Sequence, residues 1–420
     1  MIRRTFQSLA VRNYRLFFMG QLVSNIGTWC QAVAQGWLVY TLTGSGTAIG
    51  IVTALQFLPT LVGGLWAGVV ADRFDRRRIL LCTQAAMAAA AGALAVLTIG
   101  GVVQVWHIYL LALLSGVGTA LDTPARQAFV TELVGPENLP NAIGLNSAMF
   151  NASRIIGPGI AGLLIAVVGT GWCFAVNALS FAAVIAGLWT MRGSELHSPL
   201  LQPRARRQVR DGLAYAWRTP LLRTNILLIA VVGTFGINFP VILPVLAKEV
   251  FHGGSTTYSV LSSVMALGSL AGALLVAARA RPTRTVLFGS CLVFGVFSVL
   301  AALSTNLYVA VPLLVVVGAA AIAYLSTANT IVQMTCSPEM RGRVMAIYAL
   351  VLLGSTPIGG PAIGFVCQQF GAQAGLALGG LISLVGGVVA AGAARHKGDV
   401  TGVLPPVGVG LPTEEELITA

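Results

Sequence analysis

Gly68-Val69-Val70-Ala71-Asp72-Arg73-Phe74-Asp75-Arg76-Arg77-Arg78 is the segment that decides the fold of this chain. It places six charged residues within seven positions, between two long apolar runs. A short basic link between two hydrophobic segments is typical of a turn between membrane-spanning helices, and such basic turns remain on the cytoplasmic side. The segment therefore predicts a cytoplasmic turn of a membrane protein.

The composition of the whole chain supports this interpretation. Of its 420 residues, 56% are hydrophobic and 9% are charged, whereas charged residues make up about 25% of a soluble domain. We expect an integral membrane protein with the lipid bilayer around it. The net charge of +12 is assigned to cytoplasmic loops, so no nucleic-acid partner is expected. The six cysteines form no C-x-x-C pair, which favours packing over a metal site or a disulfide.

Twelve apolar segments are long enough to cross the hydrocarbon core as helices. They cover residues 14–42, 46–71, 78–99, 103–126, 141–168, 171–191, 222–247, 256–279, 285–304, 307–334, 342–370 and 373–394. If the N-terminus is cytoplasmic, 23 of the 25 Lys and Arg residues fall in cytoplasmic segments. This asymmetry predicts a multi-pass protein of the bacterial cytoplasmic (inner) membrane with both termini inside, and no cleavable signal peptide is expected.

An internal repeat divides the chain into two pseudo-symmetric halves. A shift of 202 residues aligns Pro136-Glu137 with Pro338-Glu339, and it brings Gly157 onto Gly359. Parallel six-helix repeats are the plan of a large class of transporters. The predicted domains are an N-terminal six-helix bundle (1–191), a cytoplasmic basic linker with an amphipathic helix (192–222), a C-terminal six-helix bundle (223–394) and a disordered cytoplasmic tail (395–420).

The opening segment also resembles a family signature. Residues 68–79 resemble the loop 2-3 signature of the major facilitator superfamily, G-x-L-[AG]-D-[RK]-x-G-[RK]-[RK]-x-[IL], with Val70 and Asp75 as departures. The resemblance implies an all-α fold of twelve transmembrane helices. It also implies a conformational latch, that is, a set of contacts formed when the cytoplasmic side of the transporter is closed. In that state Asp72 caps the start of span 11 near Arg341, and Arg76 meets Asp122. The alternative is that the loop only sets topology. The predicted latch residues are Gly68, Asp72, Arg73, Arg76, Asp122 and Arg341.

The fifth span resembles the antiporter signature of drug exporters, G-x8-G-x3-G-P-x2-G-G. The matching positions are Gly144, Ser153, Gly157, Pro158 and Gly162, where Ser153 and Ala161 replace glycines with other small residues. Residues 121–129 and 139–143 resemble the branch that contains the enterobactin exporters and the macrolide-efflux proteins. One departure from the superfamily's span-4 signature is Ala112, a position where that signature usually has an arginine. These resemblances imply export by exchange with protons.

Polar stripes on the spans indicate where a solute is held. In the superfamily the first helix of each three-helix unit lines the central cavity, and in span 1 the polar residues share a stripe about 120° wide. The alternative is hydrogen bonding between helices. The predicted substrate-binding residues are Gln21, Asn25, Thr28, Gln31, Gln35, Ser115, Thr119, Asn146, Arg154, Asn238, Tyr324 and Asn329.

Charges within spans are costly and therefore indicate function. Arg154 lies near the midplane of span 5, where it is expected to anchor a substrate or to couple ions; the alternative is a structural partner for Asp122 or for backbone carbonyls. Asp122, together with Arg154, is the candidate for proton coupling. A cavity without a carboxylate suits an anionic or neutral polar solute.

No P-loop, metal cluster or nucleophile-histidine pair is found in the sequence, so no cofactor and no enzymatic activity are expected. The sequence predicts a secondary active transporter, acting as a monomer, that exports a small amphiphilic solute such as a siderophore or an antibiotic by proton-coupled alternating access. An importer of a small organic anion is the alternative. A membrane enzyme or a passive structural protein is a third possibility.

Overall fold

The computed structural model describes residues 6–197, 208–279 and 283–395, and it confirms the all-α fold class. The predicted tail therefore lies outside the described residues except for Arg395. The elements of the first part are η1 (Gln7–Ala10), α2 (Arg12–Thr43), α3 (Gly46–Arg73), α4 (Arg76–Ile99), α5 (Val105–Val167), α6 (Thr170–Thr190) and η2 (Gly193–Glu195). Those of the second part are α7 (Gln208–Arg218), α8 (Pro220–Phe235), α9 (Phe239–Val245), η3 (Leu246–Val250), α10 (Ser255–Ala277), α11 (Arg284–Leu303), α12 (Leu307–Thr335), α13 (Pro338–Phe370) and α14 (Ala372–Arg395).

Among the described residues, ten helices are long and apolar enough to span a membrane. One of them, α5, has 63 residues and is divided by a kink at the non-helical Gly135 into two helices, each long enough for a hydrocarbon core about 30 Å thick. The helix α2 is not among the ten, because its polar side chains lower its hydropathy, but its 32 residues are long enough. The helices are thus consistent with the predicted twelve spans.

Two predicted spans differ in their local structure. Spans 4 and 5 are the two helices of α5, which meet at a kink at Gly135, where φ is 70°. Only glycine adopts such a backbone readily. Span 7 is divided into α8, α9 and the π-helical η3, because the chain leaves the helical conformation between Phe235 and Phe239 and two prolines follow.

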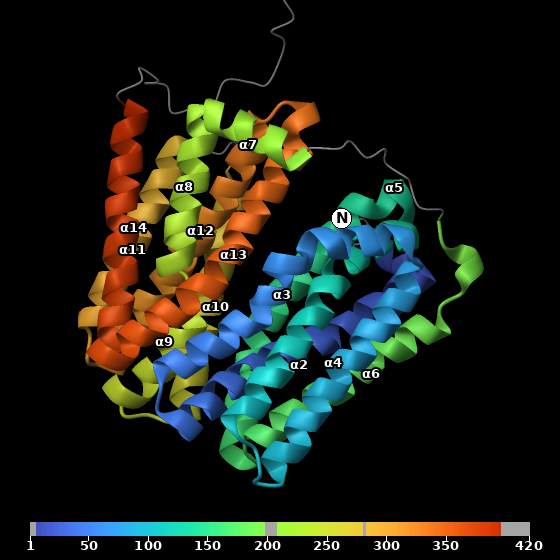
Figure 1. Cartoon of the computed structure of the whole chain (residues 1–420), viewed down its shortest axis with the longest axis horizontal. Helices are drawn as coiled ribbons and strands as arrows, with labels where there is room; N and C mark the ends of the chain where they lie inside the picture. The colour runs from blue at the N-terminus through green and yellow to red at the C-terminus, as the bar shows by residue number, and fades with distance from the viewer. Residues whose placement is uncertain (1–5, 198–207, 280–282, 396–420) are drawn as a thin grey trace, which may run out of the picture.

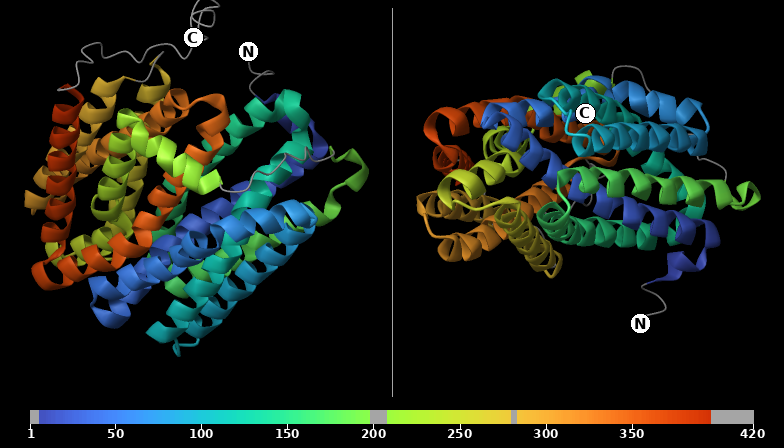
Figure 2. Two further views of the ribbon diagram at one scale, coloured as in Figure 1. Left: turned by 45° about the horizontal axis from the view of Figure 1, so that its top comes forward. Right: turned by 90° about the horizontal axis from the view of Figure 1, so that it is seen from below.

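The helices form two groups that meet at one end and diverge at the other (Figure 1). Helices α2 to α6 form one group and α8 to α14 the other, with α7 lying across the end of the second group. The described part of the chain also begins and ends on the same side as α7 (Figure 2). We call this side the α7 end and the opposite side the far end.

Glycines bring the two groups together at the far end, where α3 crosses α13. A Cβ atom on Gly50 would overlap the carbonyl oxygen of Gly360, and one on Gly46 would lie 2.8 Å from the carbonyl oxygen of Gly364. Small residues allow such close approach of helix backbones in membranes. The far end is therefore closed by direct backbone contact.

Polar and aromatic contacts add to this closure. The Tyr40 hydroxyl donates to Glu249 Oε1 at 2.8 Å, and the Ser45 hydroxyl donates to Gln368 Oε1 at 2.7 Å. The rings of Trp37 and Tyr258 stack with their centroids 6.5 Å apart. All three contacts join a residue of α2 or of the α2–α3 connection to the second group of helices.

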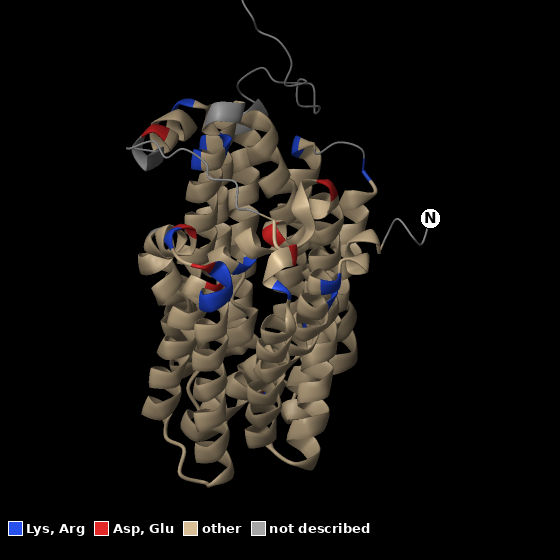
Figure 3. Cartoon of the chain, turned by 90° about the vertical axis from the view of Figure 1, so that its right-hand side faces the viewer, with Lys and Arg blue, Asp and Glu red and all other residues tan. Residues whose placement is uncertain are grey.

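The charged turn between α3 and α4 is very short. Asp75, which occupies the position of a signature glycine, is the N-cap of α4, and its carboxylate accepts hydrogen bonds from the amides of Arg77 and Arg78. Aspartate is among the preferred N-cap residues. This departure from the signature therefore has a local structural role. On the face shown in Figure 3, the charged residues gather toward the α7 end and the far end is uncharged.

Helix α7 overlaps the amphipathic helix predicted in the linker. Its Gly212 packs against Arg343 of α13, and its Tyr215 hydroxyl accepts a hydrogen bond from the amide of Ser337. Leu213 and Trp217 are about half exposed. The helix thus contacts α13 through Gly212 and Tyr215 and leaves Leu213 and Trp217 partly outward.

We predict that Gly50→Ala opens the far end. The added methyl group overlaps the backbone of α13, and overpacking of this kind costs about 1–3 kcal/mol. Spin labels at the exposed positions 42 and 370, in a chain whose exposed Cys82 is replaced by serine, would show a longer distance between the two groups. The control is Gly63→Ala, on the same helix with nothing within 4 Å of the added atom. Equal distances in both variants would contradict the prediction.

Candidate functional site

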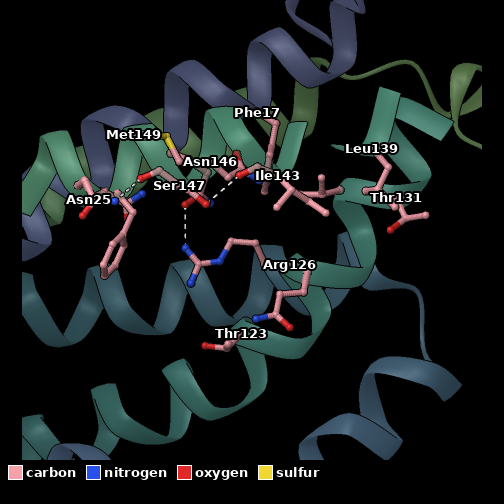
Figure 4. Close-up of a pocket in the computed structure, with 15 residues that line it drawn as sticks. Phe17, Asn25, Thr123, Arg126, Thr131, Leu139, Ile143, Asn146, Ser147 and Met149 are labelled. Atoms are coloured by element: carbon pink, nitrogen blue, oxygen red, sulfur yellow. Dashed lines mark hydrogen bonds between the residues drawn. The ribbon is translucent and has the colours of Figure 1, made fainter. Parts of the chain in front are cut away.

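A pocket of about 600 Å³ lies within the first group of helices, near the α7 end (Figure 4). Its walls come from the first half of α2 and from both parts of α5, before and after the change of direction at Gly135. It is lined by Phe17, Gln21, Asn25, Thr123, Arg126, Gln127, Val130, Thr131, Leu139, Ile143, Asn146, Ser147, Met149, Phe150 and Asn151. The lining thus combines amides and hydroxyls with large apolar side chains and a single charged residue.

That charged residue is Arg126, which reaches from one wall of the pocket toward the other (Figure 4). Its Nε lies 3.2 Å from Oδ2 of Asp122, and its Nη1 donates to Oε1 of Gln21 at 3.0 Å. The Nη2 amino group has no hydrogen-bond partner among the described residues. With 32% of the side chain exposed, the guanidinium is held in place on one side and open on the other.

Asp122 holds the arginine from behind the pocket wall. The residue is only 2% exposed, and its Oδ1 accepts hydrogen bonds from the Thr83 hydroxyl at 3.1 Å and from Gln84 Nε2 at 2.8 Å. Both of its oxygens thus have partners, as a buried charge requires. The candidate for proton coupling is therefore placed one residue layer away from the pocket, in contact with the arginine that lines it.

The polar stripe of span 1 serves two purposes. Gln21 and Asn25 line the pocket, and Nε2 of the buried Gln21 has no hydrogen-bond partner among the described residues. Gln31 instead accepts a hydrogen bond from Asn177 of α6 at 2.7 Å. This residue thus follows the alternative to substrate binding, hydrogen bonding between helices. Gln35 is buried and Thr28 is exposed, and neither lines this pocket.

Of the residues predicted on span 5, Asn146 lines the pocket and Arg154 does not. Asn146 Oδ1 accepts a hydrogen bond from the Tyr14 hydroxyl at 3.2 Å. The guanidinium carbon of Arg154 lies 5.9 Å from the centre of the Trp29 ring, a cation–π contact. On span 4, Ser115 and Thr119 also lie outside the pocket lining. The Thr119 hydroxyl donates to the carbonyl of Ser115 within the same helix.

The residues predicted in the second half do not join this pocket. Asn238 is buried and donates to the carbonyl of Thr234 at 2.6 Å. Tyr324 is 1% exposed, and its hydroxyl lacks a partner among the described residues. Asn329 accepts a hydrogen bond from Gln333 one turn along α12. In this conformation these side chains support their own half rather than the pocket.

The charged turn makes a different ion pair from the one expected of the closed latch. Arg76 pairs with Glu132 of α5, each with about an eighth of its side chain exposed, and its Nη2 lies 3.9 Å from Asp72. It does not contact Asp122 in this conformation, in which the helices diverge at the α7 end. Arg73 and Arg341 are exposed, and a Cβ on Gly68 would meet nothing within 4 Å. The latch therefore stays a prediction for the opposite state.

The antiporter signature lies in a tightly packed part of α5. A Cβ on Gly157 would overlap Trp29 of α2, and one on Gly162 would lie 2.6 Å from Cβ of Ser259 on α10. Ser153 and Pro158 are buried, whereas Gly144 has open space beside it. The signature thus places span 5 close against both α2 and the second group of helices.

Several pocket residues are absent from the sequence prediction. Arg126, at the cytoplasmic end of the predicted span 103–126, counts with the inside basic residues and not among the predicted substrate-binding residues, although it lines the pocket with Gln127, Ser147 and Asn151. The signal available in the sequence is the spacing of Asp122 and Arg126, which lie one helical turn apart and pair on the same face.

The fold and the pocket define a membrane transporter with two groups of helices, and comparison identifies its family. Residues 4–402 match the family described as transmembrane secretion effector, so the chain belongs to this family of the major facilitator superfamily. This confirms the resemblance seen in the charged turn.

Named relatives cover most of the chain. The multidrug efflux pump Tap of Mycolicibacterium fortuitum is 28% identical over 89% of this chain and 94% of its own. Macrolide efflux protein A of Streptococcus pyogenes is 26% identical over 83% and 88%. The staphyloferrin A transporter of Staphylococcus aureus is 26% identical over 61% of this chain and 64% of its own.

Solved structures show the same fold at lower identity. A bacterial homologue of the human lysosomal transporter Spinster, in an inward-facing and unoccupied conformation, has a TM-score of 0.70 with 18% identity over 94% of this chain and 98% of its own. A D-xylose-proton symporter has a TM-score of 0.69 with 12% identity over 89% and 97%.

We predict that Arg76→Gln destabilises the protein by about 3 kcal/mol, because it leaves Glu132 largely buried without its cation. Thermal unfolding of the purified protein in detergent measures the loss. The added change Glu132→Gln should recover most of it, and Arg78→Gln, whose pair with Asp75 is exposed, should have little effect. An Arg76→Gln variant that is as stable as Arg78→Gln would refute the role of the pair.

Proposed function

We propose that this protein is a secondary active transporter that exports a small amphiphilic solute, neutral or anionic, by alternating access. The pocket carries this proposal. It combines an apolar lining with amides and one cation, and it lies in a fold whose far end is closed. A siderophore or an antibiotic has this chemistry, and relatives named as efflux pumps and as a siderophore transporter support the assignment.

We further propose that the α7 end faces the cytoplasm and that both termini lie there. The basic residues that concentrate in the predicted inside segments support this orientation. The moving parts are then the bundles of residues 1–191 and 223–394, joined by the linker 192–222. The conformation described is open to the cytoplasm, from which an exported solute enters.

Protons are the proposed driving ion, with Asp122 and Arg154 as the coupling residues, and the monomer is the proposed working unit. Asp122 supports this assignment because it is a buried carboxylate in contact with the pocket arginine. A change in its charge alters the field at Arg126 and thus at the solute. Import of a small organic anion by the same pocket is the alternative.

Export predicts lower accumulation of a transported compound in cells that express the chain. A panel of siderophores and antibiotics should contain compounds whose cellular level falls on expression and recovers when an uncoupler removes the proton gradient. A level that rises on expression would favour the import alternative. If the cellular level falls on expression but does not recover with the uncoupler, proton coupling is rejected and export is not.

The coupling residues predict a second result. Asp122→Asn and Arg154→Ala should each lose most of the transport of a compound found in that panel while reaching the membrane in normal amounts, as measured by immunoblotting of membranes. Asp75→Asn, which keeps a side chain able to cap α4, serves as the matched control for removing an acid. Transport at the control rate by both variants would reject their coupling role.

A further inference from the structure

We infer that Arg126 is the anchor for a planar oxyanion of the solute, such as a carboxylate, and that the pocket therefore selects anionic amphiphiles over neutral ones. This rests on the proposed function and makes it narrower, because it names both the chemical group and its partner. Arg126 and Arg154 differ in their surroundings, since Arg154 lies over Trp29 and Arg126 lines the pocket.

The geometry of Arg126 suits two parallel hydrogen bonds to one anion. Its Nε faces Asp122 in an ion pair at 3.2 Å, and one N–H of Nη1 donates to Gln21. Nη2 has no hydrogen-bond partner within the described ranges, so its N–H groups and the second N–H of Nη1 remain for a ligand. A planar guanidinium binds a carboxylate in this bidentate way, which adds geometric specificity to the charge.

The surroundings of Arg126 make it a prepared site rather than a loose surface charge. Asp122 is itself fixed by Thr83 and Gln84, so the arginine loses little conformational freedom when a solute binds. Gln21, which is 2% exposed, keeps its Nε2 without a partner in the described structure.

The rest of the pocket suits the apolar body of such a solute. Phe17, Leu139, Ile143, Met149 and Phe150 line it together with the polar groups. No acidic residue belongs to the lining, so nothing there stabilises a solute cation directly. An amphiphile with one acidic group therefore satisfies both parts of the pocket, whereas a neutral analogue leaves the arginine donors unpaired.

A matched pair of probes tests this inference without any gradient. We would measure the binding of 2-naphthylacetate and of its neutral amide, 2-naphthylacetamide, to the purified full-length protein by titration calorimetry. The wild type should bind the anion at least about tenfold more tightly than the amide, as expected for charged hydrogen bonds. Arg126→Lys keeps the positive charge but loses the paired donors of the guanidinium, so it should keep only part of this preference.

The double variant Asp122→Asn with Arg126→Gln removes both members of the ion pair, so it leaves no buried charge alone. It should bind the two probes equally. Arg78→Gln, which removes an exposed charge outside the pocket, should keep the full preference. Size-exclusion chromatography checks the folding of each variant.

Three results would overturn the inference: no binding of the anion by the wild type, equal binding of both probes by the wild type, or a preference that persists in the folded double variant. A failure here leaves export untouched, because export is measured in cells with a gradient. Conversely, a lack of export in cells leaves the binding preference intact. The two proposals therefore fail in different experiments.

Discussion

The contact of α3 with α13 through glycine backbones is the constraint on which the rest of this structure depends. In a bilayer the hydrophobic effect does not drive helices together, so close packing of small residues has to hold them. Gly46 and Gly50 meet Gly364 and Gly360 at the far end, and the helices diverge toward the α7 end as a result. At these glycines backbone lies directly against backbone, so a single added methyl group disturbs the contact.

Most of the fold could be predicted from hydropathy and charge, because each lipid-crossing helix needs a long apolar run. The predicted range 78–99 and the helix Arg76–Ile99 agree closely, as do 307–334 and Leu307–Thr335. Hydropathy could not show that the helices of spans 4 and 5 extend until they meet at Gly135, since that depends on the conformation of this residue. It also could not show the break in span 7, because Phe235, Ile237 and Phe239 keep this stretch largely apolar.

The site could be predicted only in part, because periodicity gives a face of a helix but not its neighbour. Gln21 and Gln31 share the stripe on span 1, yet one lines the pocket and the other bonds to Asn177. Counting basic residues at the ends of spans places Arg126 at the membrane boundary. Such a count does not recognise that Asp122, one helical turn away, pairs with Arg126 at 3.2 Å and so lets the charge lie against a pocket. For Gln31 the deciding partner, Asn177, is distant in sequence.

Gly135 has a mechanical consequence for the pocket. The wall that carries Arg126 and the wall that carries Asn146 belong to two helices of α5, joined through this single non-helical residue. The second of these helices continues to Gly162, which packs against α10 of the other group. Because glycine has wide backbone freedom, a small change in the backbone angles of residue 135 would turn one wall against the other and alter the width of the pocket.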